Sequence, residues 1–257
     1  MDTSSSRPLL PQSLDEARVL QLPRAAFYIS EFITEDEEKV LLEKIASAPK
    51  PRWKQLSRRR LQTWPSDLIN NKLVDAPLPS WLEEPVLTRL LSLCLKEGVA
   101  SQSHIFEDSP HKRPNHVLIN EYPPGIGIMP HKDGAAYHPV VATVSLGATI
   151  CLNIHEMKKE GTLNKTPTWR ILQEPRSILI TTSDLYTDYL HGIDDIVEDT
   201  ELSELTIANW SLLRLGSTFH DGKNPRQTRT SLTYRDVLSV SKLGSKFMLN
   251  NSRRTLT

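Results

Sequence analysis

The sequence has little cysteine, no excess of either charge and no long apolar run. Its two cysteines, Cys94 and Cys151, are too few for a disulfide framework and fall in helix-like and strand-like runs, so we expect buried thiols in a reducing compartment. Lys plus Arg and Asp plus Glu number 31 each, which excludes a general attraction to nucleic acid. No stretch of about 18 apolar residues is present, and residues 1–6 lack the apolar segment of a secretory signal. We therefore expect an intracellular protein of the nucleus, the cytoplasm or both, with no membrane association.

The chain is long enough to bury one large hydrophobic core. A chain of 257 residues can form a single large β-rich domain without a second one. We expect a flexible N-terminal arm over residues 1–23, a single domain over 24–240 and a basic C-terminal tail over 241–257. No internal repeat is visible, and the sequence indicates no oligomeric state.

Two helices are predicted ahead of a series of strands. Thr34 and Glu37 form a capping-box pattern that predicts a helix to about Ala48, and an amphipathic pattern predicts a second helix over Pro79–Glu97. Extended segments or strands are predicted over Phe27–Ile33, His116–Tyr122, Pro139–His155, Thr168–Gln173 and Arg176–Thr182. This order predicts a mainly β fold buttressed on one side by two or more N-terminal helices.

A possible metal site begins at His131 and Asp133. In an extended segment residues two apart point the same way, so these side chains converge. With His191 they give two imidazoles and one carboxylate, a set that occupies one face of a ferrous ion and leaves positions open for a bidentate acid and dioxygen. The His-x-Asp pair alone is weak evidence in a chain with 8 histidines. Its Pro- and Gly-rich approach, which separates two strands, strengthens it.

A second polar group lies in the segment from Arg229 to Arg235. Strand alternation places Arg229, Ser231, Thr233 and Arg235 on one face. Composition alone favours an outer strand whose polar face is solvated. The functional alternative turns this face inward around a dianion whose carboxylates neutralise the guanidiniums. Asn120 and Tyr122 repeat the same spacing and offer further donors.

Taken in order, these motifs resemble the AlkB-like Fe(II)/2-oxoglutarate dioxygenases over nearly the whole chain, from Phe27 to Arg235. The shared elements are Asn-x-Tyr, His-x-Asp, a Leu-His-Gly-Ile segment around His191 and a closing Arg-x-x-x-Thr-x-Arg. The resemblance implies a double-stranded β-helix, or jelly roll. It also implies iron at His131, Asp133 and His191, with 2-oxoglutarate anchored by Arg229 and Arg235 and assisted by Asn120, Tyr122 and Ser231.

Two features depart from that family. Ser231 stands where the family usually has Asn, which removes one amide from around the cosubstrate. His191 and Arg229 are 38 positions apart, more than in compact members. The additional segment, residues 193–228, begins with the acidic run Asp194–Asp199. We favour a structural surface excursion over a lid for it, because most long insertions are tolerated surface loops.

Substrate contacts are predicted in a basic segment. Residues 52–60 carry five cations, and Trp53 and Trp64 accompany them. Such a combination suits phosphate contact and base stacking on unpaired nucleic acid. From the residues alone, a solvated loop with both tryptophans reaching back to the core is slightly favoured. The family resemblance, which places a nucleotide-recognition lid here, shifts the prediction to nucleic-acid contacts by Trp53, Arg58, Arg59, Arg60 and Trp64.

The resemblance implies oxidative demethylation of alkylated DNA or RNA, single-stranded because the target base must leave the stack. With Fe(II), O2 and 2-oxoglutarate, a substrate methyl group is hydroxylated and lost as formaldehyde, and the cosubstrate yields succinate. Two alternatives stay open. One is an oxygenase directed at a protein substrate. The other is a non-catalytic barrel that binds nucleic acid or a partner, with Ser231 marking a decayed cosubstrate site.

Overall fold

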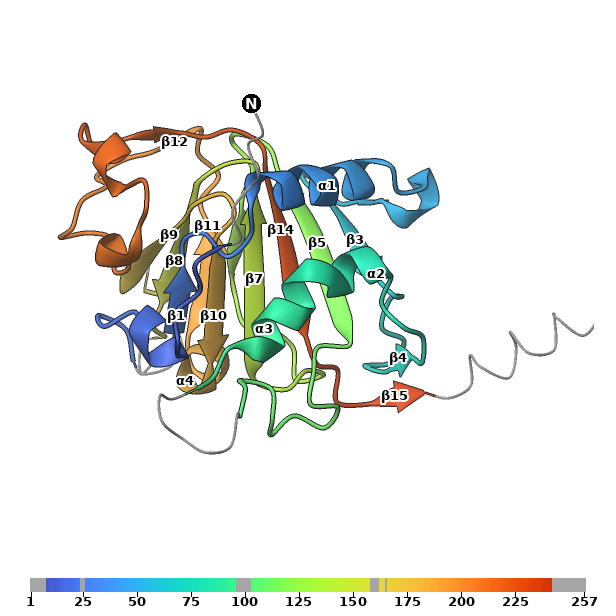
Figure 1. Ribbon diagram of the computed structural model, residues 1–257. Helices are drawn as coiled ribbons and strands as arrows, with labels where there is room; N and C mark the ends of the chain where they lie inside the picture. Colours follow the sequence, from blue (N-terminus) through green and yellow to red (C-terminus); the bar gives the residue numbers. More distant parts are fainter. Residues whose placement is uncertain (1–7, 24–25, 96–102, 158–161, 165, 242–257) are drawn as a thin grey trace, which may run out of the picture.

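The chain folds into two antiparallel β-sheets that face each other, with helices on the outer side of the larger sheet (Figure 1). The computed structural model describes residues 8–23, 26–95, 103–157, 162–164 and 166–241. Within these ranges, the predicted mainly β jelly roll buttressed by N-terminal helices is confirmed.

The larger sheet has seven strands and the smaller has four. The order in the larger sheet is β1 (Ala26–Ile29), β10 (Ile178–Thr182), β7 (Val140–Leu146), β14 (Arg229–Arg235), β5 (His116–Tyr122), β3 (Arg60–Trp64) and β2 (Lys54–Gln55). The order in the smaller sheet is β6 (Ile128–His131), β11 (Leu190–Ile193), β8 (Ile150–His155) and β9 (Trp169–Gln173). Two short pairs complete the strands, namely β12 (Glu198–Asp199) with β13 (Asn224–Pro225) and β15 (Val240–Ser241) with β4 (Leu73–Val74).

The predicted strands are observed, although the segment Phe27–Ile33 is a strand only as far as Ile29 and then turns, and the long segment 139–155 is resolved into two. It turns at Gly147 between β7 in one sheet and β8 in the other. Gly147 has φ +81°, and a Cβ there would lie 2.9 Å from the carbonyl oxygen of Thr228. Glycine therefore suits this crossing for both reasons.

The first predicted helix is confirmed as α1 (Glu35–Ala46), with the complete capping box of Thr34 and Glu37. The second is shorter and less regular than predicted. It consists of α2 (Ser80–Leu82), a wide turn over Glu83–Leu87 and α3 (Thr88–Ser92), and it ends because Leu93 is extended. The remaining helical segments are α4 (Ser183–Thr187) and the 3-10 turns Leu14–Ala17, Lys50–Arg52, Trp210–Leu212 and Gly216–Phe219.

Alternation along the central strands separates an apolar face from a polar one. Leu232 and Tyr234 of β14 pack with Leu41 of α1 and Leu90 of α3 in the main core. The opposite face of the same sheet looks toward β6, β8 and β11, so the polar residues of β14 fall between the two sheets. The fold thus encloses a polar site inside an apolar sandwich.

The N-terminal segment differs from the predicted flexible arm where it is described. Leu14 and Val19 are fully buried, and the amide of Leu14 donates to the carbonyl of Cys94 at 2.8 Å. These apolar side chains cover core that would otherwise meet water, which is why the segment packs. Residues 1–7, and 242–257 of the predicted tail, lie outside the described residues. None of the described helices is long and apolar enough to cross a membrane.

The segment 193–228 packs against the outside of the smaller sheet (orange in Figure 1). Leu202, Ile207 and Phe219 form a small core with Cys151 and Leu172 of that sheet. Its acidic start is not simply solvated, because the Asp199 carboxylate is completely buried and paired with Arg226. Most of the segment is therefore structural, as the favoured alternative predicts.

Candidate active site

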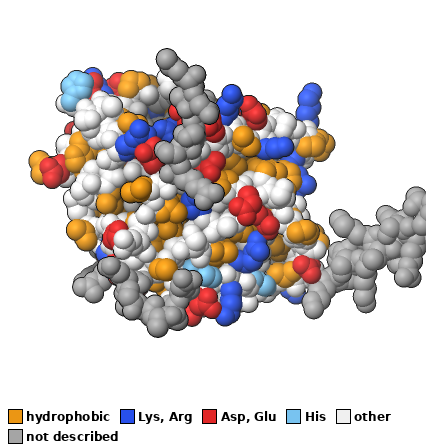
Figure 2. Space-filling model, in the orientation of Figure 1, with side chains coloured by type: hydrophobic (Ala, Val, Ile, Leu, Met, Phe, Trp, Pro, Cys, Tyr) orange, Lys and Arg blue, Asp and Glu red, His pale blue; other side chains and the backbone are white. Residues whose placement is uncertain are grey.

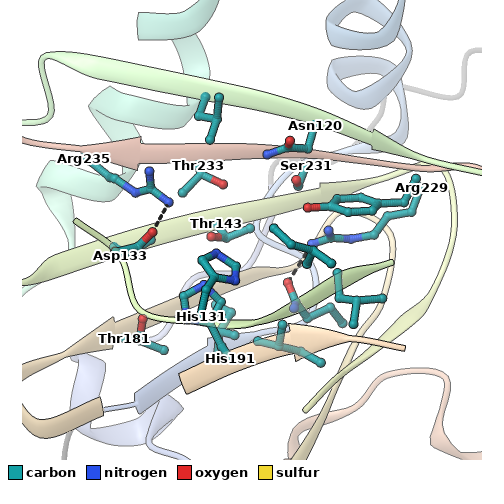
Figure 3. Close-up of a pocket in the computed structure, with 18 of the residues that line it drawn as sticks. Asn120, His131, Asp133, Thr143, Thr181, His191, Arg229, Ser231, Thr233 and Arg235 are labelled. Atoms are coloured by element: carbon teal, nitrogen blue, oxygen red, sulfur yellow. Dashed lines mark hydrogen bonds and ion pairs between the residues drawn. The ribbon is translucent and has the colours of Figure 1, made fainter. Parts of the chain in front are cut away.

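A cavity of about 250 Å³ lies between the two sheets. Strands β5, β7 and β14 form one wall, and β6, β8 and β11 form the other. Figure 3 shows its labelled side chains converging from both walls. Much of the remaining lining is apolar, including Leu152, Ile154, Leu179, Leu185 and Ile193.

His131, Asp133 and His191 meet at one end of this cavity. His131 of β6 and His191 of β11 are direct cross-strand partners, and their ring centroids lie 4.4 Å apart. One ligand atom from each of the three residues falls within 4.8 Å of the others. Antiparallel pairing thus brings together residues 60 positions apart in the sequence.

The surroundings of the two imidazoles are suited to metal binding. The ring Nδ1 of His131 lies 2.9 Å from the carbonyl oxygen of Met129, which can only accept, so Nδ1 is the donor in this bond and Nε2 is the ring nitrogen left for a metal. Burial lowers the pKa of His191 to about 4, although the nearby Asp133 carboxylate acts in the opposite direction. Two imidazoles and one carboxylate match the donor set that ferrous iron takes in oxygenases.

Arg235 lies at the same end and not beside Arg229. Its Nη2 donates to Asp133 Oδ1 at 2.6 Å, and its guanidinium stacks on Tyr137 at 4.8 Å. Six residues of extended strand separate the Cα atoms of Arg229 and Arg235 by about 20 Å. The sequence predicted that both arginines hold one cosubstrate. In the structure, Arg235 instead bonds and orients the Asp133 carboxylate, a candidate metal ligand (Figure 3).

Arg229 occupies the other end of the cavity, only 3% exposed. Its Nε donates to Ser145 Oγ at 2.9 Å and its Nη2 to Gln173 Oε1 at 2.8 Å. Both partners are neutral, and burial lowers the pKa of the guanidinium to about 10. A buried cation with neutral partners, facing a cavity, is suited to an anionic ligand.

The polar face of β14 is turned inward, so the alternative of a solvated outer strand is wrong. All seven of its residues are buried, and Ser231 and Thr233 line the cavity between the two arginines. Asn120 and Tyr122 face the same space from β5, where Asn120 is the cross-strand partner of Ser231. Burial raises the pKa of the Tyr122 hydroxyl, which stays protonated and able to donate.

The sequence of the chain matches that of a known family. A profile described as the 2OG-Fe(II) oxygenase superfamily matches residues 26–235, most of the chain. The chain belongs to this superfamily. It is accordingly an Fe(II)- and 2-oxoglutarate-dependent dioxygenase, with O2 as its second cosubstrate, and the expected cofactors are confirmed.

Individual relatives agree with this assignment. The oxygenase is 37% identical over 234 residues to "Probable RNA/DNA demethylase ALKBH6" of Danio rerio, covering 88% of this chain and 92% of that protein. This agrees with the resemblance that the sequence itself bears to AlkB homologue six, particularly around Leu118–Glu156. The oxygenase is also 27% identical to "tRNA (carboxymethyluridine(34)-5-O)-methyltransferase alkbh8" of Xenopus tropicalis, over 84% of this chain but only 32% of that longer protein.

A solved structure entitled "The structure of OsALKBH1" supports the fold alone. It aligns with a TM-score of 0.53 at 14% identity and covers 84% of this chain and 98% of that one. The resemblance to AlkB-like enzymes is confirmed by the family profile and the relatives in sequence.

Both tryptophans of the oxygenase's basic segment have neighbours other than those predicted. The Trp53 ring lies 4.1 Å from the Arg60 guanidinium. Trp64 packs edge-on against Trp81 with centroids 5.5 Å apart, and its Nε1 donates to Gln62. Both rings are partly buried and pack against the main core, which agrees with the alternative in which both tryptophans reach back to the core.

Most cations of the same segment are neutralised. Lys54 pairs with Asp67, and Arg58 with Asp195. The Arg60 guanidinium bonds Glu121 with Nε at 2.6 Å and Nη2 at 2.9 Å. Arg52 donates to the backbone carbonyls of Thr63 and Pro65, and Arg59 lines the cavity. Figure 2 likewise shows basic and acidic side chains interspersed over the displayed face.

Some functional contacts were not predicted from the sequence. Ser145 and Gln173 hold Arg229, yet they belong to predicted strands in which no site residue was predicted. Lys132 donates to the carbonyl of Thr187 at 2.6 Å, and the Tyr186 hydroxyl donates to the carbonyl of Gly134 at 2.8 Å. These two bonds tie the loop after β6, which carries Asp133, to α4. Strand alternation could have flagged Ser145, because it shares one face of an otherwise apolar segment with Thr143.

Proposed function

We propose that this oxygenase demethylates alkylated nucleic acid, with iron held by His131, Asp133 and His191. The observation that carries the proposal is the cavity itself. A ferrous donor set stands at one end and a buried, anion-seeking Arg229 at the other. Bound iron supplies the oxidising power, coupling the conversion of 2-oxoglutarate and O2 to succinate and CO2 with oxidation of a substrate C–H bond.

Cosubstrate binding is assigned to the inner part of the cavity. Arg229 binds the carboxylate remote from the metal, and Ser145 and Gln173 keep its guanidinium in place. Tyr122 and Asn120 donate from the adjacent strand, and Ser231 presents a hydroxyl where the family usually has an amide. Arg235 keeps one oxygen of Asp133 occupied and leaves the other for the metal.

The apolar wall has its own part in the reaction. Leu152, Ile154 and Leu179 line the cavity without offering side-chain donors or acceptors. Such a wall keeps water from the reacting groups and strengthens the electrostatic contacts around them. A methyl group on a substrate base would be oxidised here and lost as formaldehyde.

The names of two relatives in sequence support nucleic acid as the proposed substrate. The Danio rerio protein is named a probable RNA/DNA demethylase, and the Xenopus tropicalis protein is named for a tRNA modification. The site adds a compatible feature, since its interior carries more positive than negative side chains. A flipped base on a single strand would reach it without unpairing a duplex.

The test is succinate formation from 2-oxoglutarate with Fe(II). It compares no polymer, methylated single-stranded DNA and methylated single-stranded RNA, with His131→Ala as the control for the metal site. We expect His131-dependent turnover that rises with one polymer and releases formaldehyde. Turnover that neither polymer changes would contradict a nucleic-acid substrate and favour a protein substrate. No turnover in a folded, iron-loaded preparation would overturn catalysis in favour of a non-catalytic barrel.

A further inference from the structure

Arg59 differs from the other cations of residues 52–60. Those have carboxylate partners or, for Arg52, two carbonyl acceptors. Within the described parts of the chain, the polar side-chain contact of Arg59 is a long bond from Nε to Asn120 Oδ1 at 3.4 Å. Asn120 is neutral, so this contact leaves the charge uncompensated. The two Nη groups of Arg59, which form the fork suited to phosphate, make no hydrogen bond to the described residues.

The turn that carries Arg59 is held in place at the cavity. It connects β2 and β3, and the amide of Leu56 donates to the Arg59 carbonyl at 2.8 Å. The preceding Arg58 pairs with Asp195, whose other oxygen accepts from the Gly127 amide at 2.7 Å. Asp195 follows β11 and Gly127 precedes β6, so the turn is tied to the opposite wall. Arg59 is therefore a half-buried cation in a set position.

Charge balance indicates what this cation can bind. The cavity lining contains three guanidiniums, those of Arg59, Arg229 and Arg235, and one carboxylate, that of Asp133. Ferrous iron and the 2-oxoglutarate dianion cancel each other, so the loaded cavity keeps an excess of positive charge. Arg229 faces the inner end and Arg235 is bonded to Asp133, which leaves Arg59 for a further anionic group.

We propose that Arg59 is a substrate-binding residue that binds a backbone phosphate of single-stranded nucleic acid, beside the nucleotide whose base enters the cavity. The inference rests on the proposed function and narrows it. Of the five cations of the basic segment, Arg59 is the one left for phosphate, because Lys54, Arg58 and Arg60 are paired with carboxylates. The Arg52 guanidinium is bonded to two backbone carbonyls and lies over the Trp64 ring. A nucleotide presents its phosphate a short distance from its base, so a cation at the turn is suited to binding both parts of one substrate.

The experiment uses the full chain loaded with Fe(II) and 2-oxoglutarate under anaerobic conditions, which prevents turnover. Fluorescence anisotropy measures binding of labelled single-stranded oligothymidylate, which limits base-specific contacts, over a range of salt concentrations. Arg59→Ala is compared with Arg59→Lys and with Lys39→Ala, which removes the same charge from the exposed side of α1. Thermal unfolding and 2-oxoglutarate affinity are recorded for each variant.

We expect Arg59→Ala to weaken oligonucleotide binding about tenfold, the size of one charge-assisted contact. Its plot of log affinity against log salt should become less steep by about 0.7, the value for one phosphate on a single strand. Lys39→Ala should match the wild type, and Arg59→Lys should keep the salt slope with part of the affinity. Oligonucleotide affinity unchanged in Arg59→Ala, while the wild type binds, would overturn this inference alone. An equal loss of 2-oxoglutarate affinity would also overturn it and assign Arg59 to the cosubstrate. No binding by the wild type would overturn the inference together with the nucleic-acid part of the proposed function.

Discussion

Arg235 Nη2 donates to Asp133 Oδ1 at 2.6 Å, which joins the last residue of β14 to the loop that follows β6. Both side chains are 8% exposed. The pair therefore lies where an unpaired charge is costly. It makes Arg235 part of the candidate metal site, although the residue belongs to the strand that also carries Arg229.

The first prediction concerns metal affinity. Arg235→Met should weaken Fe(II) binding by about 10- to 100-fold, the range for losing a group that orients a ligand. Isothermal titration under anaerobic conditions, with Co(II) as a stable substitute, measures it. Arg235→Lys keeps the positive charge but loses the two-pronged guanidinium, so its metal affinity should lie between those of Arg235→Met and the wild type. Equal metal affinity for all three proteins would remove Arg235 from the metal site.

A second prediction separates cosubstrate from metal. Arg229→Ala should raise the KM for 2-oxoglutarate by about 100-fold, because the carboxylate would lose a bidentate, charge-assisted partner. Gln173→Ala should raise it about fivefold, because the buried Nη2 of Arg229 loses its acceptor but the cation stays. Metal affinity serves as the control and should follow the wild type. An unchanged KM in Arg229→Ala would contradict the assignment of Arg229 to the cosubstrate.

Local patterns were sufficient to predict the parts of the fold that depend on near neighbours. The capping box of Thr34 and Glu37 and the alternation of β14 lie within one segment each, and both are observed. The convergence of His131 and His191 was implied by the family resemblance, which rests on an ordered set of motifs and not on the His-x-Asp pair alone. These predictions required no knowledge of how distant strands pair.

The partners of buried and surface charges were not predictable in the same way. Arg60 is neutralised by Glu121, 61 positions away, and the pairing exists because β3 lies beside β5. For the same reason, the sequence could not show that Arg59 lacks such a carboxylate. Trp64 was predicted to contact substrate, but its packing against Trp81 depends on where the second helical region docks.

The third prediction is a pH dependence of stability. Burial alone would raise the pKa of Glu37, but bonds from Arg89 and from the Thr34 backbone lower it below 4.5. A carboxyl whose pKa is lowered by folding stabilises the protein above its unfolded pKa and loses that contribution as the pH falls through the folded value. Glu37→Gln should therefore lower the urea midpoint at pH 7, with the difference from the wild type shrinking below pH 4.5. A difference independent of pH would attribute the effect to packing, and Lys39→Ala on the same helix is the control.

The last prediction concerns the segment 193–228, where Asp199 and Arg226 form a buried pair at 2.7 Å. Asp199→Ala should destabilise the protein by about 3–5 kcal/mol, because it leaves the Arg226 guanidinium buried without its carboxylate. The double variant Asp199→Leu/Arg226→Met should recover much of that loss, since apolar residues of similar size carry no unpaired charge. Urea unfolding of the three proteins tests this, with 2-oxoglutarate affinity recorded alongside. A double variant as unstable as the single one would mean that the pair also fixes β12 against β13, because Asn224 donates to Asp199 at 2.9 Å and would lose its acceptor in both.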